Sequence, residues 1–195
     1  MNRNTSSSLP LRALRAAWLA LIAACLAAAG PRAHAQRASG VSESAVKAAF
    51  VCKFAAYVEW PPQAFDQPGS PIVIGVLASA PIADEVAHAA RGQAIGGRPL
   101  AVRRLAPGDA LAGLHVLYVA RTHAARLPGM LAAARAGPVL TVTESDDGQA
   151  MGMINFVVVD NKVRFDIAPH VAEASELRVS ARMLGVARRV VQKDT

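Results

Sequence analysis

Apolar side chains recur at intervals of three and four residues in the segment that ends at Trp60, and this spacing predicts an amphipathic helix. Ser42 or Ser44 is a suitable N-terminal cap. Pro61 and Pro62 must end the helix, because the residue before a proline avoids the α-helical region. Trp60 is therefore expected where the chain leaves the helix. The apolar stripe consists of Val46, Ala49, Phe50, Phe54, Tyr57 and Val58.

Four apolar segments later in the chain predict the strands of a sheet. Residues 72–77 and 114–119 lack polar alternation, as expected of strands that are covered on both faces. Residues 100–104 form a more exposed segment, and residues 139–142 follow a Gly-Pro pair. All four are short enough for strands and are bounded by residues that favour turns.

Two helices are predicted between these strands. Pro81 opens the first, and the glycines from Gly92 onward close it. The second runs from Thr122 into the early 130s, and Pro128 shortens or kinks it. Strands that alternate with helices in this way predict an α/β fold: a single domain with a mixed, mostly parallel sheet flanked by helices.

The C-terminal third has a different pattern. Residues 153–159 and 162–167 are two strands joined by Asp160-Asn161, a pair suited to the positive φ angles of a tight turn. The sequence therefore predicts an antiparallel hairpin at the C-terminal end of the sheet. Two short helices are expected after it, over residues 169–175 and 181–190.

The N-terminus has the parts of a secretory signal. A basic head precedes the apolar run 16–29, and Ala33-His34-Ala35 supplies the small residues that a signal peptidase reads. The run is shorter than the ~20 residues that span a bilayer. We therefore predict a cleavable signal over residues 1–35, a flexible lead over 36–43, a folded domain over 44–191 and a periplasmic location.

A second possibility for the N-terminus is left open at Cys25. The residues before it, Ile22-Ala23-Ala24, form an acceptable lipobox, and acylation of Cys25 would tether the domain to a membrane. The residues after Cys25 remain apolar, whereas a lipoprotein usually continues into a polar tether. Association with a membrane is expected only if Cys25 is acylated.

Removing the signal changes both the charge and the cysteine content. The signal holds four arginines, so its loss reduces the formal net charge from +7 to about +3. This value gives no reason to expect nucleic-acid binding. Of the two cysteines only Cys52 stays in the mature chain, so an intramolecular disulfide and a cysteine-based metal site are both excluded.

No segment carries a recognised catalytic motif. The histidines of the predicted domain fall on four different elements, and His115 lies inside a predicted buried strand, where a hydrogen-bonded core role is expected. Residues 144–148 hold three carboxylates after a strand; a solvated turn is expected there, and a calcium site is the alternative. We predict no catalytic residue, no metal site and no cofactor. A hydrolase would require residues that come together only in the fold.

Asn155 and Trp60 are the residues that invite a functional interpretation. Asn155 lies within an apolar run, where an unpaired amide would cost a few kcal/mol, so its side chain is expected to satisfy nearby loop backbone or to contact a ligand. Arg164 is the second candidate for a ligand contact. Phe54, Tyr57 and Trp60 are suited either to core packing or to an interaction surface.

Three segments of the chain together resemble the YfiR family of periplasmic proteins. The first is residues 47–61, which read KAAFVCKFAAYVEWP. The second is GMINF at residues 152–156, which runs on to VRFDI at residues 163–167. The third is LRVSARML at residues 177–184. The resemblance covers about residues 44–191.

The resemblance implies a function without catalysis. YfiR-like proteins are periplasmic repressors that bind the periplasmic sensor domain of an inner-membrane diguanylate cyclase, lower cyclic di-GMP and restrain biofilm growth. They tend to form homodimers and have an α/β fold. The best-known members carry disulfides, so redox control is in doubt for a chain that keeps only Cys52.

Two functions from different classes follow from these observations. For the repressor, Trp60, Pro61 and Pro62 are the predicted partner-binding residues, because a proline-fixed turn presents an aromatic ring at low entropic cost. The alternative is a periplasmic small-ligand-binding module whose pocket includes Asn155 and Arg164.

Overall fold

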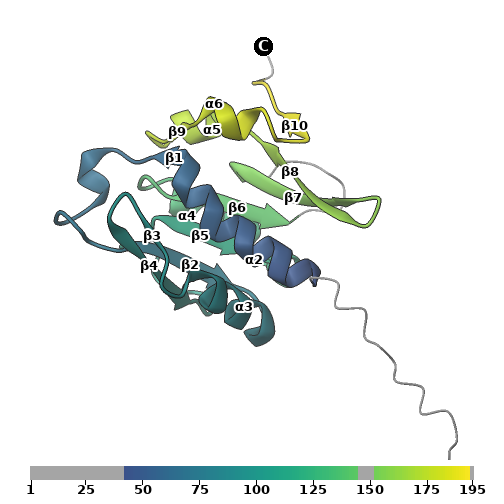
Figure 1. Ribbon diagram of the computed structural model, residues 1–195, viewed down its shortest axis with the longest axis horizontal. Helices are drawn as coiled ribbons and strands as arrows, with labels where there is room; N and C mark the ends of the chain where they lie inside the picture. The colour runs from purple at the N-terminus through teal and green to yellow at the C-terminus, as the bar shows by residue number, and fades with distance from the viewer. Residues whose placement is uncertain (1–41, 145–151, 194–195) are drawn as a thin grey trace, which may run out of the picture. The chain divides into compact units, whose positions relative to one another are not determined.

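The structure is a computed structural model that describes residues 42–144 and 152–193. These described residues form one compact unit with a mixed α/β architecture (Figure 1). The predicted signal over residues 1–35 and Cys25 lie outside the described residues, as do most of the predicted lead and residues 145–148 of the carboxylate-rich segment. In the described ranges, no helix is long and apolar enough to cross a membrane.

The first described helix, α2, covers Glu43–Phe54, and the side chain of Ser42 caps it by accepting a hydrogen bond from the backbone of Ala45. The prediction that this helix continues to Trp60 is wrong. After Phe54 the chain makes a 3₁₀ turn, η1 (Ala55–Tyr57), and then a short strand, β1 (Val58–Glu59). Strand β1 pairs antiparallel with β9 (Arg178–Val179), a partner far away in the sequence that helical periodicity cannot show.

The main sheet has eight strands in the order β10-β8-β7-β6-β5-β2-β4-β3. Neighbouring pairs from β4 to β7 are parallel, whereas β7 and β8 form an antiparallel hairpin. This confirms the predicted mixed, mostly parallel sheet. The strands are β2 (Ile72–Leu77), β3 (Ala94–Ile95), β4 (Arg98–Arg104), β5 (Val116–Val119), β6 (Leu140–Glu144), β7 (Ile154–Val159), β8 (Lys162–Ile167) and β10 (Arg189–Val190).

The turn between β7 and β8 forms as predicted. Asp160 and Asn161 have φ angles of 50° and 57°, the left-handed values that a tight hairpin turn with right-handed strand twist requires. The register pairs Val159 with Lys162 and Asn155 with Asp166. Side chains on β7 and β8 therefore alternate between the face that meets α2 and the opposite face.

Helices cover both faces of the sheet (Figure 1). Helix α2 and α3 (Ala80–Ala90) contribute to one apolar cluster with the inward side chains of β2, β5, β6, β7 and β8. Helix α4 (Leu127–Ala134), which follows the 3₁₀ segment η3 (Arg121–Arg126), packs on the other face against Leu77, Leu117 and Val119. Pro128 lies in the first turn of α4, where a missing N–H costs nothing.

The C-terminal segment folds differently from the prediction. Helices α5 (Pro169–Glu173) and α6 (Ala181–Leu184) form, and the side chain of Ser180 caps α6. The helix predicted to run to residue 190 stops at Leu184, because Arg189 and Val190 pair in parallel with Asp166 and Ile167 of β8. Here pairing with a distant strand again overrides a local helical pattern.

A cluster of four phenylalanine rings joins α2 to the hairpin. Phe50 and Phe54 on α2 meet Phe156 on β7 and Phe165 on β8, with ring centroids 5.0–6.2 Å apart. Tilted and edge-to-face pairs at this distance add to the stabilisation that comes from burial alone. Phe54, Phe156 and Phe165 are buried, so the predicted core role of Phe54 is confirmed.

Candidate functional site

The predicted partner-binding residues line one cleft of about 530 Å³. We call it the Trp60 cleft. Trp60, Pro61 and Pro62 form one side, and the segment around α5 and β9 forms the other. The remaining lining residues are Glu59, Glu173, Glu176, Leu177 and Arg178. The structure thus brings the two ends of the domain together at the residues that the sequence selected.

Trp60 is held in place by its neighbours on both sides in sequence. Strand β1 fixes the chain before it, and Ser180 N–H donates a hydrogen bond to the carbonyl of Tyr57. After it, Pro61 leads into the 3₁₀ turn η2 (Pro62–Ala64). Trp60 and Pro61 are half-buried and Pro62 is exposed.

The ring of Trp60 packs against a column of side chains. It meets Phe65 and His115 edge-on, with centroids 6.4 and 6.3 Å away. Phe65 and His115 stack on each other at 4.5 Å, and the guanidinium of Arg98 lies 3.7 Å above the Phe65 ring. Trp60 therefore has the packing role considered from sequence, and it also lines the cleft, where the interaction role stays a prediction.

His115 fixes the loop that carries Trp60. The backbone N–H of Val73 donates to Nδ1 at 3.1 Å, so the proton is on Nε2, which donates to the carbonyl of Ala64 at 2.9 Å. Burial is the main cause that lowers the pKa of His115 below its usual value of 6.5. The neutral ring joins β2 to η2, which confirms the hydrogen-bonded core role predicted for this histidine.

Acidic groups dominate the charge of the Trp60 cleft. Glu59, Glu173 and Glu176 are exposed there with a single cation, Arg178, among the lining residues. Glu176 accepts a hydrogen bond from Gln63 at 2.7 Å and has a φ of 59°, a left-handed conformation that costs energy for a residue with a side chain. The cleft combines an aromatic ring, two prolines and a negative rim.

The predicted ligand residues lie elsewhere. Asn155 is fully buried on β7, and its Oδ1 accepts a hydrogen bond from Thr143 Oγ1 at 2.9 Å. Among residues 42–144 and 152–193 the partner of its Oδ1 is thus a neighbouring strand residue and not loop backbone. Within the described residues its Nδ2 has no hydrogen-bond partner. Arg164 is exposed on β8, opposite Val157. Neither residue lines the Trp60 cleft.

A second cleft of about 400 Å³ opens where β5 and β6 end, and we call it the strand-end cleft. The strand order reverses between β2 and β5, because β4 lies on one side of β2 and β5 on the other. Such a reversal is where open α/β sheets bind ligands. The lining includes Ser44 and Lys47 from α2, Tyr118, Thr122 and Glu144.

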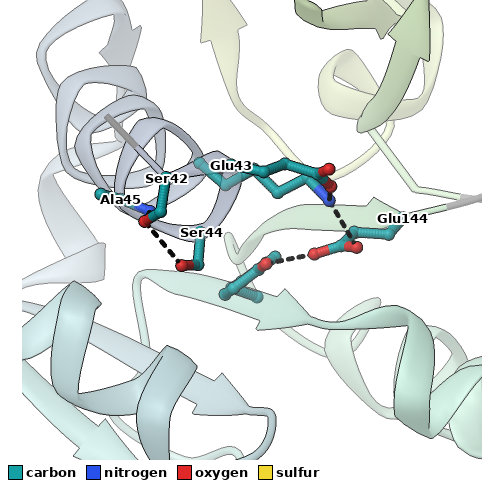
Figure 2. Close-up of polar contacts among 7 residues, drawn as sticks. Ser42, Glu43, Ser44, Ala45 and Glu144 are labelled. Atoms are coloured by element: carbon teal, nitrogen blue, oxygen red, sulfur yellow. Dashed lines mark hydrogen bonds and ion pairs between the residues drawn. The ribbon is translucent and has the colours of Figure 1, made fainter. Parts of the chain in front are cut away.

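The floor of the strand-end cleft is a buried ionic network (Figure 2). Lys47 Nζ lies 2.8 Å from Glu144 Oε2 and 2.6 Å from Glu43 Oε1, and the hydroxyl of Tyr118 donates to the other oxygen of Glu144. Burial, together with the Glu144 charge, raises the pKa of Tyr118. Lys47 and Glu144 are 5% and 7% exposed.

This network corrects the prediction made for residues 144–148. Glu144 is the last residue of β6 and is buried, so it does not belong to a solvated turn. Its partners Lys47 and Tyr118 are 97 and 26 residues away in sequence. A lysine on the buried side of an apolar helix was the one signal of such a pair, since buried charges need a partner.

Two other candidate chemistries can be assessed in the same way. Among residues 42–144 and 152–193, no group of three histidine, cysteine or carboxylate side chains is arranged to hold a metal ion. Cys52 is buried on α2, and burial raises the pKa of its thiol to about 11, so it stays protonated and unreactive at neutral pH.

Comparison with known proteins matches residues 44–188 to the profile described as YfiR/HmsC-like. No curated protein matches the chain. A solved structure of similar fold is the ABC domain from Streptococcus pneumonia in complex with L-Trp, with a TM-score of 0.52 and 11% sequence identity. That alignment covers 74% of this chain and 60% of the solved one, so this chain spans about 60% of that structure's length. At this identity the likeness concerns the fold alone.

Replacing Lys47 with methionine tests the buried network. Glu144 would keep Tyr118 as a partner but lose its counter-charge, so we expect the free energy of unfolding to fall by about 3–5 kcal/mol in urea titrations. The control is Lys53→Met on the exposed side of the same helix, expected to change stability by about 0.5 kcal/mol or less. Adding Glu144→Gln to Lys47→Met should recover much of the loss. Equal effects of the two single variants would contradict the assignment.

Acid should weaken the fold through His115. The pKa of His115 is lower in the folded state than in the unfolded chain, so its contribution to stability is present above about pH 6.5 and is lost as the pH falls below that value. We expect the free energy of unfolding to decrease from pH 7.5 to pH 5. The decrease should be smaller in His115→Asn, whereas His88→Asn on the exposed surface should behave like the parent protein. Identical pH profiles for all three would refute this role.

Proposed function

The chain belongs to the YfiR/HmsC-like family, and on that premise we propose that it is a non-enzymatic periplasmic regulator of cyclic di-GMP signalling. Its target in this proposal is the periplasmic sensor domain of an inner-membrane diguanylate cyclase, which it binds and holds inactive. Release of the cyclase would raise cyclic di-GMP and favour biofilm growth. Family membership supports the regulatory theme and the periplasmic location.

The observation that carries the binding site is the Trp60 cleft. An interface hot spot needs an aromatic anchor that is already positioned and a surrounding rim that excludes water. Trp60 meets the first condition, because β1, Pro61 and the His115–Phe65 stack limit its movement. Pro62, which is exposed, supplies apolar surface beside it. We propose Trp60, Pro61 and Pro62 as partner-binding residues.

The charges that line the Trp60 cleft predict the charge of the partner's surface. Three carboxylates and one guanidinium surround the aromatic anchor, so the partner is expected to present lysine or arginine there. Charge complementarity of this kind mainly accelerates association, and salt weakens it. Binding should therefore become slower as the ionic strength rises.

Repression needs only a difference in affinity between two cyclase conformations. A regulator that binds the inactive state more tightly shifts the equilibrium by that ratio, and about 10⁴-fold is needed to move it from 1:99 to 99:1. None of the lining residues of the Trp60 cleft has to perform chemistry. We also propose that the protein forms a homodimer. Its activity in this proposal is not controlled by oxidation of Cys52, because that side chain is buried and burial raises the pKa of its thiol.

A second candidate function is the capture of a small solute. The strand-end cleft favours it, because it lies at the reversal of strand order and gathers hydroxyl and charged groups. Asn155 and Arg164, the ligand contacts predicted from sequence, do not line this cleft, so this candidate rests on the cleft's own residues. The solved ABC domain of similar fold is in complex with L-Trp, which makes L-Trp a suitable first probe in calorimetry. No heat of binding with L-Trp or other amino acids would count against it.

Truncation of Trp60 tests the leading proposal. We expect Trp60→Ala to weaken capture of the diguanylate cyclase from detergent-solubilised membranes by about tenfold or more, in line with the loss of a hot-spot aromatic. Cellular cyclic di-GMP should rise toward the level of a gene deletion. Because the ring packs on Phe65 and His115, the melting temperature should also fall by a few degrees, and not stay constant as the sequence alone suggested.

A second variant separates binding from stability. Glu173 is exposed and has no ion pair among the described residues, so Glu173→Lys should leave the melting temperature unchanged and lower partner affinity. Val158→Ala and Lys162→Glu, both at exposed positions on the hairpin, are the matched controls. Recovery of no cyclase by the parent protein, together with unchanged cyclic di-GMP in a deletion strain, would refute the regulatory function.

A further inference from the structure

A third cavity, of about 360 Å³, lies between α2 and α6, and we call it the aromatic pocket. Its floor consists of Phe54, Phe165 and Met183, which are 2%, 5% and 2% exposed. Phe50 and Tyr57 are half-buried and form its walls. The volume lies within the range of small-molecule sites, which are mostly apolar and hold a few polar groups.

Two cations stand at the rim of the aromatic pocket. Lys53 lies on α2 and Arg182 on α6, and both are exposed. Among the described residues neither has an ion-pair or hydrogen-bond partner, and no carboxylate lines the pocket. Lys47 in the strand-end cleft, by contrast, is engaged with Glu144. The rim is therefore a pair of unneutralised positive charges above an aromatic floor.

This pocket is distinct from the Trp60 cleft. Strands β1 and β9 run between the two, with Glu59 and Arg178 lining the cleft and Tyr57 and Arg182, just beyond the paired residues, lining the pocket. The two cavities share no lining residue. The Trp60 cleft is rich in carboxylates and the aromatic pocket has none, so the two sites select ligands of opposite charge.

We propose that the aromatic pocket binds a small aromatic carboxylate. A flat ring fits against Phe54 and Phe165, because offset and edge-to-face contacts between aromatic rings are favourable. The carboxylate then lies at the mouth, where Arg182 provides a planar pair of donors and Lys53 a second positive charge. Neither the family profile nor the proposed regulatory surface assigns a ligand to these residues.

The small size and the recessed floor favour a small molecule over a protein segment as the occupant. The aromatic floor is buried, so only a slender group reaches it. Val186, which is 69% exposed at the rim, extends the apolar surface by a single side chain. A ligand of about a dozen non-hydrogen atoms is expected to bind with a dissociation constant of roughly 0.1–1 mM.

Calorimetry with three related probes tests the proposal. The protein is expressed from its full sequence and purified in the form that remains after any processing in the cell. Naphthalene-2-carboxylate should bind in the stated range, 2-naphthylmethanol about tenfold more weakly, and 2-naphthylmethylammonium more weakly still. Raising the salt concentration should weaken the carboxylate only. No binding of the carboxylate at several millimolar, or equal binding of the carboxylate and the alcohol, would overturn the proposal.

Two variants locate the charge contribution. Lys53→Gln and Arg182→Gln should each reduce the affinity for naphthalene-2-carboxylate about two- to fivefold, and the double variant about tenfold, with no change for the alcohol. The matched control is Lys162→Gln with Arg91→Gln, two exposed cations away from the pocket. Melting curves show whether each variant is folded. An unaltered affinity in the double variant would refute the assignment.

Methyl labelling gives a readout of position that is independent of affinity. In protein labelled with ¹³C at the methionine methyl groups, the carboxylate should shift the resonance of Met183, which lies on the pocket floor. Met130 packs on the opposite face of the sheet and should not move. A shift at Met130 without one at Met183 would place the ligand elsewhere. None of these measurements uses a cyclase, so their outcome is separate from that of the regulatory proposal.

Discussion

The buried pair of Lys47 and Glu144 is the interaction on which the placement of the proposed functional surfaces depends. It fixes the first turns of α2 to the end of β6, and Tyr118 extends the same network to β5. Two charges that are 5% and 7% exposed are tolerated only when they neutralise each other, so the helix has one allowed position along the sheet. The phenylalanine cluster then fixes the second half of α2 against the hairpin.

A second buried carboxylate completes the frame at the other end of the chain. Asp166 is fully buried on β8 and receives Arg188 through two hydrogen bonds, at 2.8 and 2.5 Å, and Arg189 through a third at 3.0 Å. These contacts hold β10 at the edge of the sheet after α6 has ended. The short C-terminal elements, which have too few residues to be stable alone, are thereby held over α2, where they form one side of both the Trp60 cleft and the aromatic pocket.

The sequence was sufficient to predict the structure of segments whose conformation depends on local interactions alone. The buried strands at residues 72–77 and 114–119, a serine cap at Ser42 or Ser44 and the Asp160–Asn161 turn all depend on local chemistry, and the sequence predicts them. The errors fall where a distant partner decides. Residues 58–59 were expected in a helix but pair with residues 178–179, and residues 189–190 were expected in a helix but pair with β8. Glu144 was expected in a solvated turn but is buried against Lys47. The sequence singled out Trp60 because two prolines follow it, and its role in binding stays a prediction. The acidic rim of its cleft was not found, since Glu59, Glu173 and Glu176 are separated in sequence.

Helix α2 lines two of the three cavities, and the segment that directly follows it lines the third. Lys47 lies at the strand-end cleft, Phe50 and Lys53 line the aromatic pocket, and the chain that leaves the helix carries Glu59 and Trp60 into the third. The charged groups at the floor of the strand-end cleft, Lys47 and Glu144, already form an ion pair with each other. A ligand there would have to compete with that ion pair. The rims of the other two cavities carry charges that the described residues do not neutralise. Because a rigid helix anchored at both ends cannot move one cavity without disturbing its anchors, recognition by this domain should depend on surfaces already formed, with any conformational change taking place in the partner.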